Sequence, residues 1–128
     1  MIAYKGVRSI RKATRESVVT VVSSLLDELL GQDELSEDQV VVLLDSGMDR
    51  IRDGRAALRL GQVVGGWKLG DTAGAGTVVL ETIRRIKRLE AEVVIAVFEM
   101  GDRDSLGFHS LGYLAATRAR GGYYEIQV

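Results

Sequence analysis

The chain has 128 residues, of which 46% are hydrophobic and 27% charged, and a formal net charge of −1 at pH 7. This size and composition are typical of one folded domain with a buried core, so we expect a single globular domain over residues 1–128. The absence of cysteine excludes disulfides, thiolate zinc sites and cysteine nucleophiles, and the single histidine, His109, excludes a multi-histidine metal site. We therefore expect no metal site and no cofactor.

Charge and hydropathy also limit the partners that the chain can have. No apolar run approaches the roughly 20 residues that a membrane span needs, and residues 1–12 lack the apolar segment of a signal peptide. We therefore expect a cytoplasmic protein with no membrane partner. A nucleic-acid partner is not expected, because the net charge is near zero and aromatic residues that could stack on bases make up only 5% of the chain.

The spacing of apolar residues changes along the first half of the chain. Residues 2–10 are rich in β-branched and aromatic side chains, which predicts a strand. Apolar residues then recur every three or four positions over residues 16–30, which predicts an amphipathic helix with Thr14 available as its N-cap. Residues 36–45 fit either a helix or a strand, because a capping-box pattern at Ser36 precedes an apolar run that is typical of a buried strand. We favour one helical turn leading into a strand.

The elements of the second half are predicted from the same helical and strand spacings of apolar residues. This half is expected to hold helices over residues 48–62, 77–89 and 105–119, a short strand and turn over residues 63–67, and strands over residues 92–98 and 123–128. Together these elements predict an α/β or α+β domain, with a mixed sheet of about four strands covered by three or four helices.

The stretch GDTAGAGTVVLETIRRIKR, residues 70–88, has three glycines in seven residues before the helix expected from Thr77. Free N–H groups at a helix N-terminus beside a flexible backbone can bind an anion. A tight turn packed closely against its neighbours is the alternative interpretation. The candidate ligand-binding residues are Asp71, Thr72, Gly74, Ala75, Gly76 and Thr77 in this stretch, with Arg11, Arg84 and Arg85.

The DTAGAG segment at residues 71–76 resembles the Asp-Thr-x-Gly-Ala-Gly-Asp anion hole of ribokinase-like sugar kinases. In that family the last Asp is the catalytic base, and Thr77 stands at its position here. The chain is also too short to contain the sugar and nucleotide sites of that family. What the resemblance implies is therefore an anion-binding loop and not sugar-kinase activity.

A second resemblance covers more of the chain and points to small trimeric chorismate mutases of the AroH type. The matching segments, in the same chain order, are RSIRKAT at residues 8–14, EDQVVVLLDSGMD at residues 37–49, GGW at residues 65–67 and TIRR at residues 82–85. The resemblance implies that Arg11 and Arg84 grip the carboxylates and the ether oxygen of the substrate. The family's catalytic glutamate has no clear counterpart, because Glu81 lies within the expected helix.

The expected closing strand bears on assembly. Tyr123 and Tyr124 would point to its opposite faces, so we expect one in the core and the other exposed. A terminal strand also leaves a sheet edge that subunits commonly cover, and we therefore expect a homo-oligomer.

Two functions remain open from the sequence. The first is binding of an anionic small molecule by the glycine-rich loop and arginines, with a chorismate mutase-like enzyme as one form of it. The alternative is a structural or protein-interaction module with no small ligand. No general acid, base or nucleophile is identified, so whether the chain is an enzyme stays open.

Overall fold

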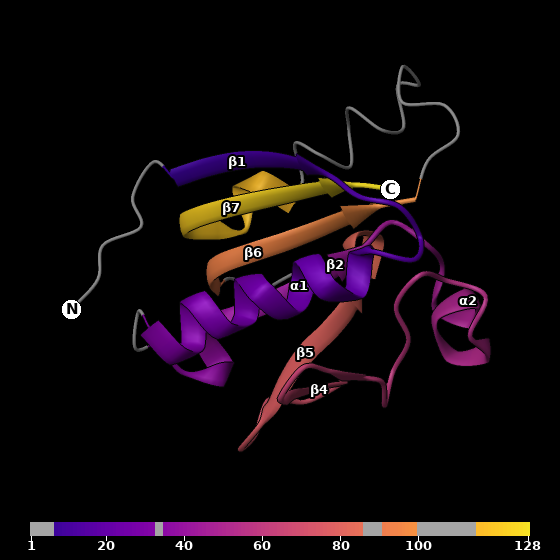
Figure 1. Ribbon diagram of the computed structural model, residues 1–128, viewed down its shortest axis with the longest axis horizontal. Coiled ribbons are helices and arrows are strands. Elements are labelled where there is room, and N and C mark those ends of the chain that lie inside the picture. The colour runs from indigo at the N-terminus through magenta and orange to yellow at the C-terminus, as the bar shows by residue number, and fades with distance from the viewer. Residues whose placement is uncertain (1–6, 33–34, 86–90, 100–114) are drawn as a thin grey trace.

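A seven-stranded sheet forms the centre of the computed structural model, which describes residues 7–32, 35–85, 91–99 and 115–128. Its strands are β1 (Val7–Lys12), β2 (Val40–Leu44), β3 (Val63–Val64), β4 (Trp67–Gly70), β5 (Thr77–Thr82), β6 (Ala91–Phe98) and β7 (Ala119–Gln127). They lie in the order β1-β7-β6-β2-β5-β4-β3, and all neighbours are parallel except β3 and β4 (Figure 1). The predicted α/β class and mixed sheet are confirmed, whereas the expected strand number of about four was too low.

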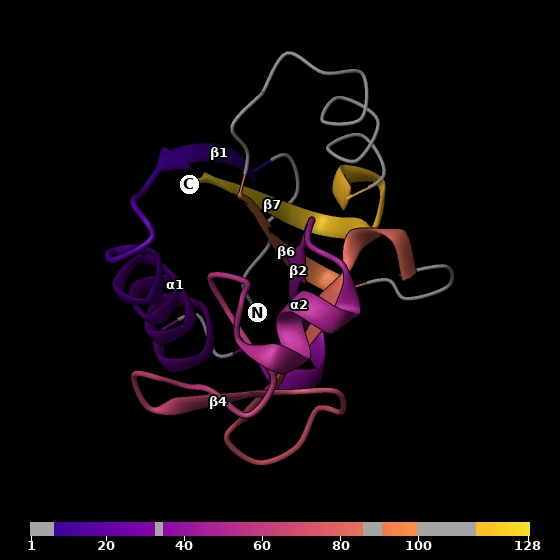
Figure 2. The same cartoon turned by 90° about the vertical axis from the view of Figure 1, so that its right-hand side faces the viewer.

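Two α-helices lie wholly within the described residues, fewer than the three or four expected. They are α1 (Val18–Leu26), which continues as the π-helical segment η1 (Asp27–Gln32), and α2 (Met48–Asp53). Both pack on the same face of the sheet, because one core cluster contains α1 side chains such as Leu25, Ile51 of α2 and Ile95 of β6 (Figures 1 and 2). The helix predicted over residues 16–30 is therefore confirmed. No helix in the described ranges is long and apolar enough to cross a membrane.

The two central strands are apolar along their whole length. All five residues of β2 and seven of the eight in β6 are buried. Strands of a parallel sheet that is covered on both faces have this pattern, because alternate side chains enter cores on opposite sides. The second core cluster, on the face away from α1, includes Leu43, Val94 and Phe98. The strand predicted over residues 92–98 and the turn-then-strand predicted over residues 36–45 are confirmed, the turn being η2 (Glu37–Gln39) with its capping box.

The helix predicted over residues 77–89 is wrong for the residues that the structure describes. Residues from Thr77 to Thr82 form β5, and a single 3-10 turn, η3 (Ile83–Arg85), follows. Burial alternates along β5, with Val78 and Leu80 buried and Val79 half-buried between them. The apolar spacing that suggested a helix is compatible with this period-two pattern, and pairing with β2 and β4 decides in favour of the strand. Residues 86–89 lie outside the described ranges.

Two further boundaries differ from the predictions. The helix predicted over residues 48–62 ends at Asp53, because Gly54 adopts the left-handed conformation with φ 82° that terminates many helices. The strand predicted over residues 123–128 begins at Ala119, inside the range predicted for the preceding helix. Of that predicted helix, residues 105–114 lie outside the described ranges, and residues 115–117 are helical.

The closing strand is not an edge of the sheet, contrary to expectation. β7 lies between β1 and β6, and its Tyr123 and Tyr124 are both buried, with 4% and 5% of their surface exposed. The two rings do enter cores on opposite faces, as predicted from strand geometry. The expectation that one of them is exposed is wrong, because core side chains cover both faces of β7.

Candidate functional site

The connections that leave β2 and β6 diverge at the carboxyl ends of these neighbouring strands. After β2 the chain passes through α2 to β3, β4 and β5, all on one side of β2, whereas β6 is followed by β7 on the other side. Ligands of open parallel sheets bind at such a point, where successive strands are laid down on opposite sides. Figure 2 looks onto these ends of the strands.

Two carboxylates, Asp45 and Glu99, occupy this point. Asp45 follows β2 directly, and Glu99 follows β6 directly. The backbone N–H of Glu99 donates to Oδ1 and Oδ2 of Asp45, at 3.1 and 3.2 Å, and the backbone N–H of Asp45 donates to the carbonyl of Val97 at 3.2 Å. The ladder between β2 and β6 thus continues one step beyond the strands through the Asp45 side chain.

The Glu99 carboxylate is nearly buried and has a partner for each oxygen. Its side chain is 7% exposed. Arg15 Nη1 donates to Oε1 at 2.6 Å, and the hydroxyl of Ser46 donates to Oε2 at 2.8 Å. Ser46 is itself buried, so this second bond takes place away from water. A carboxylate at this depth is stabilised only with such charge-assisted bonds.

A second arginine approaches the same carboxylate from α2. Arg50 Nη2 lies 4.0 Å from Glu99 Oε1. The carbonyl of Arg55 accepts bonds from Arg15 Nη2 at 2.8 Å and from Arg50 Nη2 at 3.3 Å, so it fixes both guanidinium groups. The side chains of Arg15 and Arg50 remain 50% and 45% exposed. Both guanidinium groups are therefore partly exposed to solvent, while the carbonyl of Arg55 holds them in place.

The surroundings of Asp45 raise the pKa of its carboxyl group. Burial raises the pKa of Asp45 above its ordinary value of 3.8, and the negative charge of Glu99 raises it further. The bond from the Glu99 N–H and the charge of Arg50 lower the pKa without cancelling the rise. A carboxyl group with a raised pKa can exchange a proton with a ligand near neutral pH more readily than an ordinary aspartate. We call Asp45, Ser46, Glu99, Arg15 and Arg50 the carboxyl-edge cluster.

No group of three or more potential metal ligands occurs among the described residues. In the carboxyl-edge cluster, Asp45 and Glu99 are the carboxylates, and both already accept hydrogen bonds from the protein. Their arrangement fits recognition of a polar organic ligand and proton transfer better than it fits a closed metal site.

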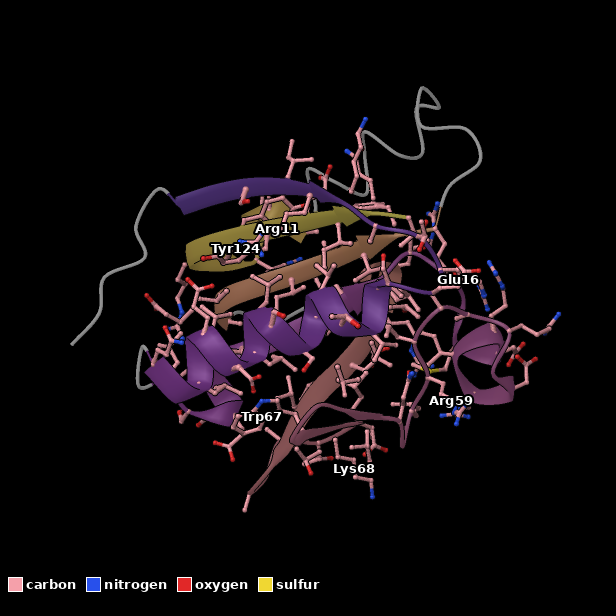
Figure 3. All side chains as sticks on the ribbon, viewed as in Figure 1. Arg11, Glu16, Arg59, Trp67, Lys68 and Tyr124 are labelled. Atoms are coloured by element: carbon pink, nitrogen blue, oxygen red, sulfur yellow. The ribbon has the colours of Figure 1, made fainter. Side chains whose placement is uncertain are left out.

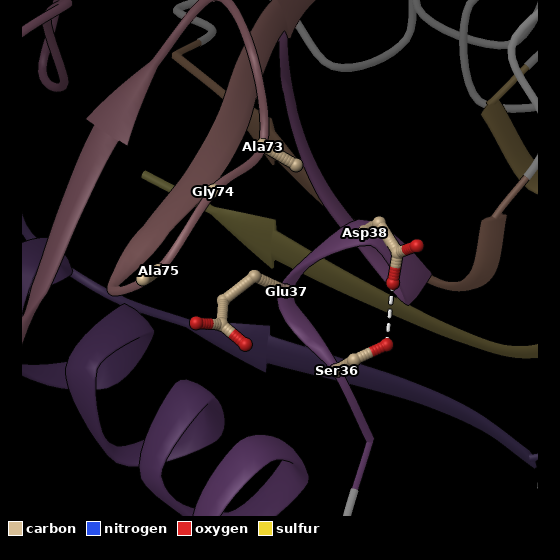
Figure 4. Close-up of a pocket in the computed structure, with 6 residues that line it drawn as sticks. All are labelled: Ser36, Glu37, Asp38, Ala73, Gly74 and Ala75. Carbon is tan, nitrogen blue, oxygen red and sulfur yellow. Dashed lines mark hydrogen bonds between the residues drawn. The ribbon is translucent and has the colours of Figure 1, made fainter.

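The glycine-rich loop lies at the opposite end of the sheet and precedes a strand. The backbone N–H of Gly76 donates to Glu37 Oε2 at 2.7 Å. Ser36, Glu37 and Asp38 face residues 73–75 across a pocket of about 330 Å³ (Figure 4). A carboxylate of the protein thus takes the hydrogen bond that an external anion was expected to accept, and the other acid lining the pocket, Asp38, adds to the negative charge.

The structure does not bring the loop and the predicted arginines together within one chain. Arg84 and Arg85 lie in η3, and β5 separates them from Gly76 by about 20 Å of extended strand. Arg11 lies on β1, with its guanidinium 5.6 Å from the ring centre of Tyr124 (Figure 3). β1 and β5 are four strand spacings apart, about 19 Å, so Arg11 and Arg84 do not share a site in the chain.

The remaining predicted loop residues surround the turn. Asp71 and Thr72 are exposed, and the Thr72 hydroxyl lies 3.4 Å from Asp71 Oδ1. Thr77 begins β5, and its N–H donates to the carbonyl of Gly74, which closes a tight turn around Gly76 in the left-handed conformation, with φ 74°. His109 lies outside the described residues.

Asp45 and Glu99 were not predicted as site residues from the sequence. Each is the first charged residue after an apolar run, VVVLLD and VVIAVFE, and directly follows a buried parallel strand. That position was the available signal, because the carboxyl ends of parallel strands carry the ligand-binding residues of α/β folds. In comparisons with known proteins, no protein-family model matches the chain, and no curated protein gives a significant match.

Proposed function

We propose that the chain binds a small anionic organic molecule at the carboxyl ends of β2 and β6, with Arg15 and Arg50 as its anion-binding groups. One observation carries this proposal. Two half-exposed guanidinium groups and a pair of largely buried carboxyl groups meet where the connections from two central strands diverge.

The arginines have donors to spare. Arg15 uses one N–H of Nη1 for Glu99 and one of Nη2 for Arg55, and Arg50 uses Nη2 for the same carbonyl. A guanidinium carries five N–H donors in a planar fork that matches a carboxylate or a phosphate. The described contacts orient the guanidinium groups of Arg15 and Arg50. They leave solvent-facing N–H groups of both that a ligand can bind.

Asp45 is the group that would exchange a proton with the bound anion. An anion bound beside it would raise its pKa further, since a second negative charge disfavours the ionised form. Binding is then coupled to proton uptake by Asp45, and Asp45 can return that proton to the ligand. The proposed site is therefore suited to proton transfer on a carboxylate- or phosphate-bearing molecule.

This proposal retains an anionic ligand and arginines and moves the site away from residues 71–76. The Gly76 N–H is engaged by Glu37, and the pocket beside it is acidic, so the loop is a poor place for an anion. In the alternative function, a protein-interaction module, the contact between Arg15 and Glu99 would be a structural ion pair and no small anion would bind.

Thermal unfolding in the presence of phosphate, nucleotides, sugar phosphates, small dicarboxylates, chorismate and prephenate tests the proposal. A ligand at about a hundred times its dissociation constant should add roughly 2.7 kcal/mol, enough to raise the midpoint by several degrees. Arg50→Gln should abolish that shift, while Lys68→Gln, an exposed change on β4 away from the cluster, should preserve it. No shift with any compound, or a shift that survives in Arg50→Gln, would overturn the proposal.

A further inference from the structure

Strand β1 lies at one edge of the sheet that the described residues form. The N–H of Ala13 donates to the carbonyl of Gln127 at 2.9 Å. The backbone groups of Ala13 and of every second residue before it therefore face β7. Since N–H and C=O groups alternate sides along a strand, those of Arg8, Ile10 and Lys12 face outward. No described strand pairs with that side.

The side chains on this edge combine an apolar centre with positive charge. Ile10 is 57% exposed, an unusual exposure for a large apolar side chain in this structure, and Lys12 is exposed beside it. The strand sequence VRSIRK has three basic residues and no acidic one. Its charge therefore differs in sign from the net charge of the chain.

Pairing of β1 with a second copy of itself is disfavoured by this charge pattern. In an antiparallel pair centred on Ile10, Arg8 of each copy would stand opposite Lys12 of the other. Like charges directly opposite each other destabilise a strand pair, and basic residues are a common protection of sheet edges against self-association. The edge is thus selective against copies of this chain and open to a strand of the opposite charge.

We infer that β1 is a docking edge for an extended acidic peptide segment of another protein, which adds to the sheet as an eighth, antiparallel strand. The segment would carry acidic residues two positions before and two positions after an apolar residue. The apolar residue would lie against Ile10, and the acidic residues would stand opposite Arg8 and Lys12. Backbone hydrogen bonds supply the affinity of such strand addition, and alternate side chains supply its specificity.

A synthetic peptide tests this inference directly. We would use a nine-residue peptide with Glu at its third and seventh positions, Val at its fifth and Thr elsewhere, and follow binding by fluorescence anisotropy. A peptide with Lys in place of both Glu residues is the charge control. The Glu peptide should bind and the Lys peptide should not. Equal binding of both peptides, or no binding of either, would overturn the inference.

Backbone pairing is tested separately from charge. N-methylation of the Val removes an N–H that faces β1 and should weaken binding about tenfold or more, while N-methylation of the Thr before it, which faces away, should not. Both methylated peptides carry the same charge. If both bind as well as the parent, the attraction is purely electrostatic and the docked strand is wrong.

The protein side has its own matched variants. Ile10→Pro removes an outward N–H that β1 does not use for pairing with β7, so it should abolish peptide binding and leave the thermal midpoint nearly unchanged. Lys12→Glu should weaken binding of the Glu peptide a few-fold and favour the Lys peptide, whereas Lys68→Glu, on β4 at the far side of the sheet, should do neither. Full peptide binding by a folded Ile10→Pro protein would contradict the proposed edge.

Discussion

Arg15 joins three segments of the chain through a single guanidinium group. Its Nη1 lies 2.6 Å from Glu99 Oε1, and its Nη2 lies 2.8 Å from the carbonyl of Arg55. The residues that follow β1, β6 and α2 are thereby held together at the carboxyl ends of β2 and β6.

The Arg15 contact should contribute measurably to stability. Arg15→Gln leaves the nearly buried carboxylate of Glu99 with the Ser46 hydroxyl and a distant Arg50, and we expect a loss of about 1–2 kcal/mol. The loss is smaller than for a fully buried pair because half of the Arg15 side chain is exposed. Urea unfolding measures it, with Arg59→Gln as an exposed control that should stay within about 0.5 kcal/mol of the parent. Equal stability of all three proteins would contradict the assigned contact.

The raised pKa of Asp45 predicts how stability depends on pH. The folded protein holds the Asp45 proton at pH values where the unfolded chain, near 3.8, has released it. The contribution of Asp45 to the free energy of unfolding therefore decreases as pH rises from about 3.8 to its raised pKa, and levels off above that value. Asp45→Asn lacks this titration but keeps an oxygen for the Glu99 N–H.

Unfolding free energies of the parent and Asp45→Asn at a series of pH values test this sign. The stability of the parent minus that of the variant should fall as pH rises from about 4. A difference that increases with pH would mean that the pKa is lowered in the fold, which contradicts the electrostatics of the cluster.

The turn after β4 predicts that alanine substitution lowers stability at Gly76 but changes it little at Gly74. Gly76 has φ 74°, so Gly76→Ala forces a left-handed conformation on a residue with a Cβ and should cost about 1–2 kcal/mol. Gly74 is not in the left-handed region, and a Cβ there would have no contact within 4 Å, so Gly74→Ala should change stability little. Thermal unfolding of the two variants measures this contrast, and a larger loss for Gly74→Ala would be inconsistent with the turn.

Substitutions in β5 separate the observed strand from the predicted helix. Leu80 is fully buried, and Leu80→Ala should cost about 2–5 kcal/mol. Val79, half-buried on the other face of the strand, should lose much less on Val79→Ala. A helix with Val79 and Ile83 facing inward predicts the reverse order. Urea midpoints of the two variants therefore decide between the two structures.

The sequence alone was sufficient to predict the elements whose local apolar pattern matches the structure that they adopt in the fold. The one-sided apolar stripe of residues 16–30 became α1 and its π-helical continuation, and the apolar runs before Asp45 and Glu99 became buried strands. In the two strands, burial and β-branched content favour the same structure, whereas in residues 16–30 the one-sided apolar stripe outweighs the low helix propensity of the β-branched residues.

The sequence was insufficient where strand pairing decides the structure. Val79 and Ile83 are spaced like helix residues, and only the presence of β2 and β4 on either side makes residues 77–82 a strand. The candidate site has the same limitation, because Asp45 and Glu99 are 54 positions apart and meet only once β6 lies beside β2. Within one chain, the predicted grouping of Arg84 with Gly76 is separated because strand β5 runs between the loop and η3.

The most direct test of the central claim is the location of an anion on the folded protein. We would titrate ¹⁵N-labelled protein with the anion that stabilises it most and follow the backbone amide resonances. We expect the largest shifts at Asp45, Ser46 and Glu99 and at the residues around Arg15, with little change at residues 71–76. Shifts concentrated at residues 71–76, or no shifts at the carboxyl ends of β2 and β6, would contradict it.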